Sequence, residues 1–416
     1  MTLQEARQKD QLDPLKSYRN EFLIPEKDGK QIVYLVGNSL GLQAKSIEKA
    51  IAIELQKWQN KGVEAWFEGE EPWIPYLQHL KKPIAKLTGA NDDEVTIMNS
   101  LTVNLQLMLS SFYRPTATKF KILTEAGAFP SDQYALESHV ITRGFEPDTC
   151  IIEVAPKAGK HLLETEQILE AVTLHQDSLA LVMLGGVNYY TGQMLDMEKI
   201  AQKANQLGIT IGFDLAHAIG NVPLKLHDWG VDFAVWCSYK YLNAGPGAIA
   251  GAFVHQKHHE SNLSRLAGWW GYDEATRFKM QKGFVPMRGA DGWQLSTPNM
   301  LAMACHRAAL GIFEEIDLEQ LRKKSQELTQ YLYDEINQYP QIEIITPKDS
   351  AWRGAQLSLL VEKNGKALFE ELTKNNIWGD WREPNCIRLS PVPLYNTFED
   401  IWNVSQVLSQ SFDKNL

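Results

Sequence analysis

The sequence predicts an α/β fold in which a large domain with a mainly parallel sheet is joined to a smaller α+β domain. Strand-like and helix-like patterns alternate over residues 150–213, which is typical of right-handed crossovers between parallel strands. After residue 298, two long helical patterns are followed by a mixture of short strands and helices. We therefore assign residues 61–298 to the large domain and residues 1–60 and 299–416 to the small domain, a usual division for this length.

The first 90 residues contain one predicted strand and two predicted helices. In chain order, the elements are a strand ending at Val36, a glycine-rich turn GNSLGL over 37–42, a helix over 46–59, an aromatic loop over 66–75 and a helix over 76–88. Ser46 is the expected N-cap of the first helix, and Gly89 is expected to end the second. The turn lacks the spacing of a P-loop or a dinucleotide fingerprint, so we do not interpret it as a phosphate site.

Hydrophobic periodicity predicts the remaining elements. In the large domain these are strands over 119–124, 150–154, 179–184, 209–213, 231–237 and 248–254, and helices over 101–111, 164–174 and 197–207. In the small domain they are helices over 299–316, 318–338, 366–375 and 398–412, and strands over 342–346, 355–361 and 377–388. The segment 266–292 is aromatic and glycine-rich, and loops of this length are usually functional.

Composition excludes several classes of function. A net charge of −10 argues against a nucleic-acid partner, which needs a basic face. The longest apolar stretch, near 179–184, is too short to cross a bilayer, so no membrane partner is expected. The start is polar and acidic, unlike a signal peptide, and a reducing cytoplasm is the expected location. The four cysteines lie far apart, which argues against a zinc site or a disulfide framework: Cys150, Cys237, Cys305 and Cys386.

Three histidines follow the strand that ends at Val254. His255, His258 and His259 stand in a polar run that is typical of a solvated face. A metal site is the weaker interpretation, because the sequence shows no set of acidic residues spaced to complete it. We therefore expect no metal.

The stretch from Gly208 to Gly251 carries the strongest chemical signal. Two buried strands end there, one at Asp214 and the other just before Ser238-Tyr239-Lys240, and His217 lies between them. In an open α/β sheet, ligands bind outside the carboxyl ends of the strands. Pyridoxal phosphate needs a lysine for a Schiff base and an acid at its pyridine nitrogen, and Lys240 and Asp214 suit these roles. Taken singly, each residue also suits a surface lysine or a helix cap.

Two further segments suit the phosphate and the ring of that cofactor. Residues 99–102 (NSLT) open a helix whose free N–H groups and hydroxyls could bind a phosphate, although an ordinary N-cap has the same sequence. Phe129 follows another strand end and could stack on the pyridine ring. Asp132 could cap the next helix or reach the cofactor.

Read together, these motifs resemble the kynureninase family of fold type I pyridoxal-phosphate enzymes. The resemblance covers nearly the whole chain and rests on YLVGNSLGL, PWI, FPSD, GGVNYYTG, DLAHAIGNVPL, SYKYLNAGPG, GWWG with TRFKM, and IRLSPVPLYN. It implies the aspartate-aminotransferase-like fold with a seven-stranded-type sheet, pyridoxal phosphate as cofactor, and a homodimer with shared active sites.

The resemblance also implies roles for single residues. Lys240 would bind the cofactor aldehyde, Asp214 would pair with the pyridine nitrogen, and Tyr239 would relay protons. The other implied cofactor contacts are Leu101, Thr102, Phe129, Ser131, Asp132 and His217, with Trp269 and Thr297 donated across the dimer interface. Arg388 would bind the substrate α-carboxylate, with Ser39 and Trp66 as further substrate contacts. Trp66 and Tyr272 replace histidines of other members, which leaves recognition of the aryl ring open.

The implied reaction is hydrolysis of kynurenine or 3-hydroxykynurenine to anthranilate or 3-hydroxyanthranilate and alanine. This reaction belongs to tryptophan catabolism or NAD biosynthesis, and the sequence does not distinguish them. Cysteine desulfurases and selenocysteine lyases share the fold, but they have histidine where this chain has Tyr239 and use a mobile cysteine. An aminotransferase would lack GNSLGL, and an inactive regulator would carry a DNA-binding domain, of which there is no sign.

Overall fold

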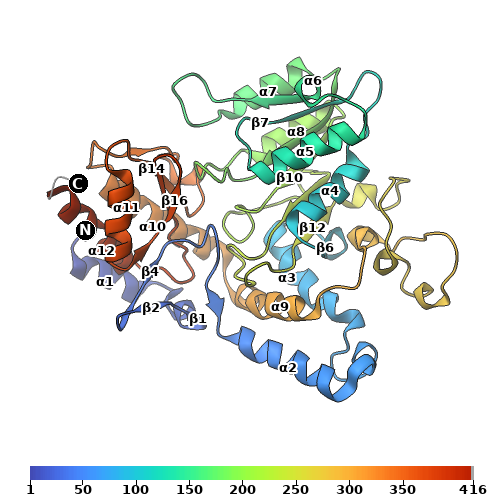
Figure 1. Cartoon of the computed structure of the whole chain (residues 1–416), viewed down its shortest axis with the longest axis horizontal. Helices are drawn as coiled ribbons and strands as arrows, with labels where there is room; N and C mark the ends of the chain where they lie inside the picture. The colour runs from blue at the N-terminus through green and yellow to red at the C-terminus, as the bar shows by residue number, and fades with distance from the viewer. Residues whose placement is uncertain (414–416) are drawn as a thin grey trace.

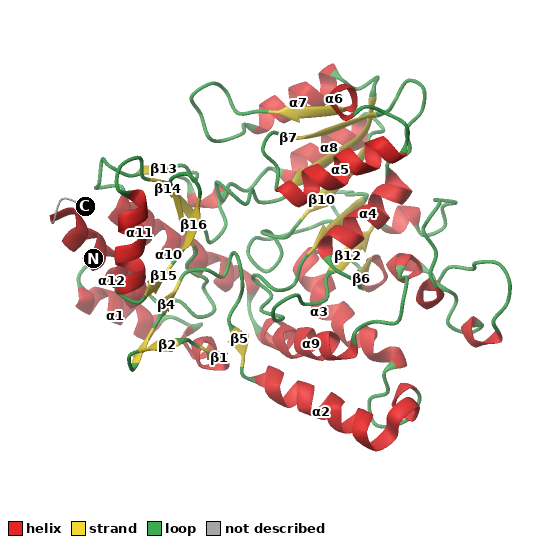
Figure 2. Ribbon diagram, in the orientation of Figure 1, coloured by secondary structure: helices red, strands yellow, loops and turns green. Residues whose placement is uncertain are grey.

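A seven-stranded sheet forms the centre of the larger domain in the computed structural model, which describes residues 1–413 (Figures 1 and 2). From edge to edge the strands are β6 (Val95–Ile97), β12 (Gly251–Val254), β11 (Phe233–Trp236), β10 (Thr210–Asp214), β9 (Leu179–Gly185), β7 (Lys121–Glu125) and β8 (Ile151–Val154). Among these, β12 pairs antiparallel with both of its neighbours and the other pairs are parallel. The predicted mainly parallel sheet is confirmed.

Helices cover both faces of this sheet because its strands are apolar on both sides. Along β9, Leu181 and Met183 pack on the face of α4 and α5, whereas Val182 and Leu184 join the core on the opposite face. This alternation follows from the two-residue period of a strand. The helices of the large domain are α3 (Gln78–Thr88), α4 (Leu101–Phe112), α5 (Pro130–Thr142), α6 (Pro147–Cys150), α7 (Thr165–Leu174) and α8 (Met197–Gln206).

The smaller domain contains both ends of the described chain and an antiparallel sheet covered by helices (Figure 1). Its sheet has the order β13 (Glu343–Ile344), β14 (Leu357–Leu360), β17 (Cys386–Leu389) and β16 (Asp380–Arg382). Its helices are α1 (Leu3–Leu12), α10 (Leu318–Ile336), α11 (Gly365–Lys374) and α12 (Phe398–Asp413). Short strand pairs complete the chain: β1 (Phe22–Leu23) with β5 (Gln43–Ala44), β2 (Glu26–Lys27) with β3 (Lys30–Gln31), and β4 (Val33–Tyr34) with β15 (Ile377–Trp378).

Helices α2 (Ser46–Lys61) and α9 (Met300–Glu315) lie side by side below the sheet (Figure 1). Ser46 was predicted to be the N-cap of α2, but Lys45 holds that position and the Ser46 hydroxyl donates instead to the Ala308 carbonyl at 3.2 Å. The Ser46 hydroxyl therefore bonds a residue of another helix, and it does not cap its own helix as the local sequence predicted. Gly89 ends α3 in the left-handed conformation, as predicted. The domain boundaries at residues 61 and 299 stay a prediction.

The architecture brings several strand ends to one edge of the sheet. Asp214 is paired in register with Gly185 of β9 and with Val235 of β11, so these strands end at the same level. Glu125 ends the neighbouring strand β7. Within residues 1–413, no helix is long and apolar enough to span a bilayer.

Candidate active site

A cavity of about 120 Å³ lies at this edge of the sheet. It is lined by Leu101, Thr102, Glu125, Phe129, Ser131, Asp132, Gly185, Val187, Tyr189, Asp214, Ala216, His217, Tyr239 and Lys240. Nine of these residues are the ones that the sequence assigned to the cofactor within one chain. These nine come from four separate segments, and only the shared edge of the sheet brings them together.

Lys240 follows β11 and points its amine into the cavity. Its Nζ lies 2.9 Å from Nε2 of His217 and 5.9 Å from the ring centroid of Phe129. Burial, followed by the charges of Lys240 and Arg388, holds the pKa of His217 well below its usual range. His217 is therefore a neutral imidazole whose Nε2 lies within hydrogen-bond distance of the Lys240 amine.

Two buried carboxyl groups, Asp214 and Asp132, also line the cavity. Burial raises the pKa of both carboxyl groups. The pKa of Asp132 is raised well above its usual range, because the charge of Asp214 adds to the effect of burial. Oδ1 of Asp214 accepts the Ala216 N–H at 2.7 Å. Oδ1 of Asp132 has no hydrogen-bond partner. Asp132 thus keeps the proton, and Asp214 is the carboxylate of the pair.

The starts of α4 and α5 form the opposite end of the cavity. Oγ1 of Thr102 lies 2.6 Å from Oγ of Ser131, so the first turns of the two helices meet there. Ser100, the N-cap of α4, makes no side-chain capping bond, which leaves N–H groups of the first turn free. Two helix starts and two hydroxyls together form an anion site.

These residues fit pyridoxal phosphate. The cavity offers an amine for the aldehyde, a carboxylate for the pyridine nitrogen, an exposed aromatic ring in Phe129 and an anion site for the phosphate. The unpartnered Oδ1 of Asp132 is a polar atom that the cofactor could satisfy. When bound, this cofactor supplies an electron sink for bonds broken at the substrate's Cα and Cβ.

The turn GNSLGL packs directly against the backbone of Tyr239 and Lys240. The N–H of Gly41 donates to the Tyr239 carbonyl at 2.8 Å. A Cβ at Gly41 would lie 2.2 Å from the Lys240 carbonyl oxygen and 2.2 Å from Oδ1 of Asn243. Position 41 therefore requires glycine, because any side chain would displace the segment that carries Lys240.

Arg388 lies in β17 and is held by three neighbours. Its guanidinium is 1% exposed, donates to the Tyr189 carbonyl at 2.6 Å and to Oγ of Ser39 at 3.2 Å, and forms a short ion pair with Asp380. Nε of Arg382 also pairs with Asp380, at 3.1 Å from Oδ1. Arg388 thus lies outside the lining of the cofactor cavity and is linked to it through Tyr189.

Three of the predicted residues lie away from this cavity. Trp66 packs edge-on against Trp73 and Trp270, with ring centroids 5.1 and 5.6 Å apart. Trp269 is 43% exposed, and Thr297 is also exposed. Both lie at the borders of the long aromatic segment, which extends away from the sheets at the right of Figure 1. Within one chain they do not contact the site.

Sequence reasoning missed Glu125, Tyr189 and Asp380. Glu125 is 6% exposed at the end of β7. An acid at the end of an apolar strand indicated a site residue at Asp214, and the same pattern could have identified Glu125. Tyr189 lies in GGVNYYTG, which the sequence placed at the crevice without assigning a residue. Asp380 carried no local signal, because only the pairing of β16 with β17 brings it to Arg388.

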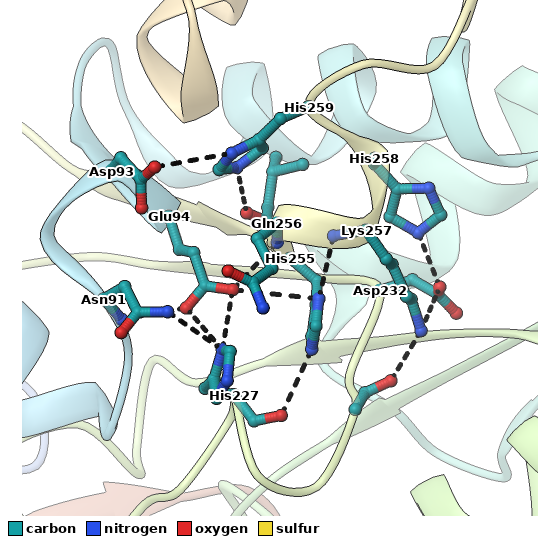
Figure 3. Close-up of polar contacts among 12 residues, drawn as sticks. Asn91, Asp93, Glu94, His227, Asp232, His255, Gln256, Lys257, His258 and His259 are labelled. Carbon is teal, nitrogen blue, oxygen red and sulfur yellow. Dashed lines mark hydrogen bonds and ion pairs between the residues drawn. The ribbon is translucent and has the colours of Figure 1, made fainter.

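The histidines after β12 are not on a solvated face, which corrects that expectation (Figure 3). His255 is 9% exposed, and its Nδ1 lies 3.7 Å from Oε1 of the buried Glu94. His258 pairs with Asp232 at 2.7 Å, and His259 lies 3.7 Å from Asp93. Acids distant in sequence supply these partners, since the loops at this end of the sheet fold together.

Glu94, His227 and His255 offer donor atoms within 4.8 Å of one another. The two imidazole rings are stacked with an interplanar angle of 12°, so their Nδ1 lone pairs do not converge on one point. Nδ1 of His255 also accepts the Lys257 N–H at 3.1 Å. This cluster serves to join β6, β12 and the loop of His227 (Figure 3).

Known proteins of similar sequence carry the same family name. Residues 321–408 match the family described as the kynureninase C-terminal domain. The chain is 47% identical to a kynureninase of Flavobacterium psychrophilum, with 100% of this chain and 99% of that protein covered. It is 50% identical to a kynureninase of Xanthomonas campestris, with 94% of each covered.

Solved structures with the same fold are more distant in sequence. The cysteine desulfurase CsdA of Escherichia coli has a TM-score of 0.78 at 16% identity, covering 96% of this chain and 98% of that one. A C-DES mutant with glycine covalently linked to its PLP cofactor has a TM-score of 0.76 at 16% identity, covering 90% of this chain and 96% of that one. At such identity these likenesses establish the fold type alone. No cysteine lines the cavity around Lys240.

Proposed function

Because the chain belongs to the kynureninase family, we propose that it hydrolyses L-kynurenine, 3-hydroxy-L-kynurenine or both, releasing the corresponding anthranilate and L-alanine. Water adds at the γ-carbonyl, the Cβ–Cγ bond breaks, and Cβ takes up a proton. This activity is a step of tryptophan catabolism. The observation that carries the proposal is the single cavity in which Lys240, Asp214, Asp132 and Phe129 surround a space suited to pyridoxal phosphate.

Lys240 is the residue that moves protons. Its amine lines the cavity and lies 2.9 Å from the neutral His217, so an amine freed from the cofactor could remove and return a proton at the substrate. Asp214 is the carboxylate that would pair with the pyridine nitrogen of the bound cofactor. Tyr239 is the proposed relay near the phosphate, although burial raises its pKa and keeps the phenol protonated without that partner.

Direct assay of the purified protein tests this function. Mixing it with pyridoxal phosphate and kynurenine should release anthranilate, which is followed by its fluorescence, together with one equivalent of alanine. The same assay with 3-hydroxykynurenine measures the preference between the two substrates. Release of sulfur from cysteine, without anthranilate, would instead support the desulfurase alternative.

Arg388 is the proposed site of the substrate α-carboxylate. In the described chain Asp380 already holds this guanidinium, and Asp380 is also paired with Arg382. We propose that the substrate carboxylate replaces Asp380 at Arg388, while Asp380 remains with Arg382. Ser39 contacts both Arg388 and Asp380 and is placed to take part in this exchange.

Replacing Arg388 with lysine should raise KM for kynurenine by roughly 30- to 150-fold, or about 2–3 kcal/mol, and lower kcat less. Lysine keeps the charge but loses the planar fork that binds a carboxylate in two places. Steady-state kinetics give both values. Arg7→Lys is the matched control, because Arg7 also pairs with an acid, Glu399, but at an exposed position, and its KM should change little. Normal KM in Arg388→Lys would refute this role.

The protein should form a homodimer in which each site receives Trp269 and Thr297 from the partner subunit. Support comes from the exposed apolar side chains of this region, among them Leu266, Phe278 and Met280 at 59, 50 and 69% exposure. Stable interfaces of this kind bury apolar side chains. Light scattering of the active protein should give twice the chain mass of 47.1 kDa. A mass of one chain would refute the shared site.

The remaining expectations concern surroundings and partners. We expect a cytoplasmic protein that binds neither nucleic acid nor membranes. The net charge of −10 supports the expectation that it does not bind nucleic acid. We also retain residues 61–298 as the cofactor-binding domain and the flanking segments as the small domain.

A further inference from the structure

Glu125 is a buried acid at the active site to which the proposed reaction gives no role. Its Oε2 accepts the Gly185 N–H at 3.0 Å, and the side chain of Asn188 faces its carboxyl group. It lines the cofactor cavity and also a neighbouring cavity of about 280 Å³. Tyr189 lines both cavities as well, so these two side chains form the partition between them.

Through Asn188, Glu125 supports the junction loop, which we define as residues 186–192. Oδ1 of Asn188 accepts the N–H groups of Tyr190 at 3.0 Å and Thr191 at 2.9 Å. The side chain of Asn188 thus organises the loop through its oxygen and also faces Glu125. Glu125 therefore supports both Gly185, just before the loop, and the Asn188 side chain within it.

The small domain binds the other side of the junction loop through its carbonyl groups. Arg388 donates to the Tyr189 carbonyl at 2.6 Å, and Gln356 donates to the same oxygen at 3.0 Å. The hydroxyl of Ser358 donates to the Tyr190 carbonyl at 2.5 Å. The ring of Tyr189 also packs edge-on against Phe129, with centroids 5.2 Å apart. The loop therefore contacts both the cofactor-stacking residue and the carboxylate-binding arginine.

The charges that face Glu125 come from every neighbouring element. Asp214 of β10 and Asp132 of α5 lie on the cofactor side, together with Lys240. His161, in the second cavity, is paired with Glu343 of the small domain at 3.2 Å. Burial, with a smaller contribution from Asp214, raises the pKa of Glu125 to about 7. Below neutral pH the group is protonated, which limits the negative charge in the pocket.

We propose that Glu125 is a positioning residue that holds the junction loop so that Tyr189 orients Arg388 towards the substrate carboxylate and supports Phe129 against the cofactor ring. The part that concerns Arg388 rests on the function proposed above. Glu125 acts in its neutral form, since ionisation would place a further negative charge beside Asp214 in a buried site.

The first test uses the apoprotein and does not depend on the reaction. Glu125→Gln keeps an acceptor for Gly185 and is neutral at every pH. A group with a raised pKa in the folded state stabilises the chain at low pH and loses this contribution as pH rises through that pKa. Wild type and Glu125→Gln should therefore unfold at similar temperatures at pH 5, and the variant should become the more stable one by pH 8. An offset that is independent of pH would overturn the neutral form of Glu125.

The second test measures the link to Arg388. Holoenzyme variants are titrated with L-alanine, which carries the α-carboxylate without the aryl ring, while the visible absorption of the cofactor is followed. Glu125→Ala should weaken binding about tenfold or more, because Gly185 and Asn188 lose their partner, and Glu125→Gln should bind nearly as wild type does. Wild-type affinity in Glu125→Ala would overturn the proposal.

Two further variants keep this test decisive. Asn188→Ala cuts the same connection from the loop side and should weaken alanine binding as Glu125→Ala does; it decides the question if Glu125→Ala does not fold. Glu153→Gln, an exposed acid on β8 that pairs in register with Thr124, is the matched control and should change nothing. If wild type itself neither binds alanine nor forms anthranilate, the proposed function fails, whereas the apoprotein test still judges Glu125.

Discussion

Replacing Lys240 with alanine should lower kcat for anthranilate release by about 10⁴-fold or more, the upper range for loss of a general acid–base group. Lys240 is expected both to hold the cofactor aldehyde and to move the substrate proton, so no other group can take over both roles. Its amine is the one that lies 2.9 Å from His217 and faces the ring of Phe129. Fluorescence assay of variant and wild type measures the loss.

Chemical labelling gives an independent view of the same residue. Borohydride reduction of the yellow wild-type protein should abolish its colour and leave the label on the peptide of Lys240, and Lys240→Ala should take up none. Lys225→Ala, which removes an exposed lysine, is the control and should behave as wild type does. Label on another lysine would disprove this assignment.

Replacing Asp214 with asparagine should lower kcat by about 10²–10³-fold, the scale reported for one preorganised electrostatic group. Asparagine keeps an oxygen that can accept the Ala216 N–H but removes the charge that we propose to pair with the pyridine nitrogen. Substrate affinity should change much less, because Arg388 is untouched. Steady-state kinetics and a titration of the cofactor spectrum with kynurenine separate these two effects.

A matched control for this change is available in the same part of the chain. Asp228→Asn removes an exposed acid and should leave kcat unchanged. Asp132 is unsuitable as a control because it lines the same cavity and its pKa depends on the charge of Asp214. Turnover by Asp214→Asn at the wild-type rate would contradict the division between Asp214, which acts on chemistry, and Arg388, which acts on binding.

The sequence by itself determined the fold class and most of the cofactor cavity. Apolar runs that stop at a polar residue marked the strand ends of Asp214 and Lys240, and the carboxyl ends of parallel strands meet at one edge of a sheet. Residues on different strands were therefore predicted to meet, although the chain separates them widely. Helix starts and strand ends depend on neighbouring residues, which is why local patterns located them.

Only the tertiary structure decided which polar groups are paired. Ser46 hydrogen-bonds Ala308 instead of capping its helix, and His255 lies against Glu94 instead of in solvent. Arg388 is held by Asp380 and by a carbonyl of the junction loop, and Glu125 supports that loop from the opposite side. These pairings join segments that are distant in the chain. These pairings form because the groups are buried together and because the domains pack against each other. The sequence immediately around each group shows neither its burial nor its partner.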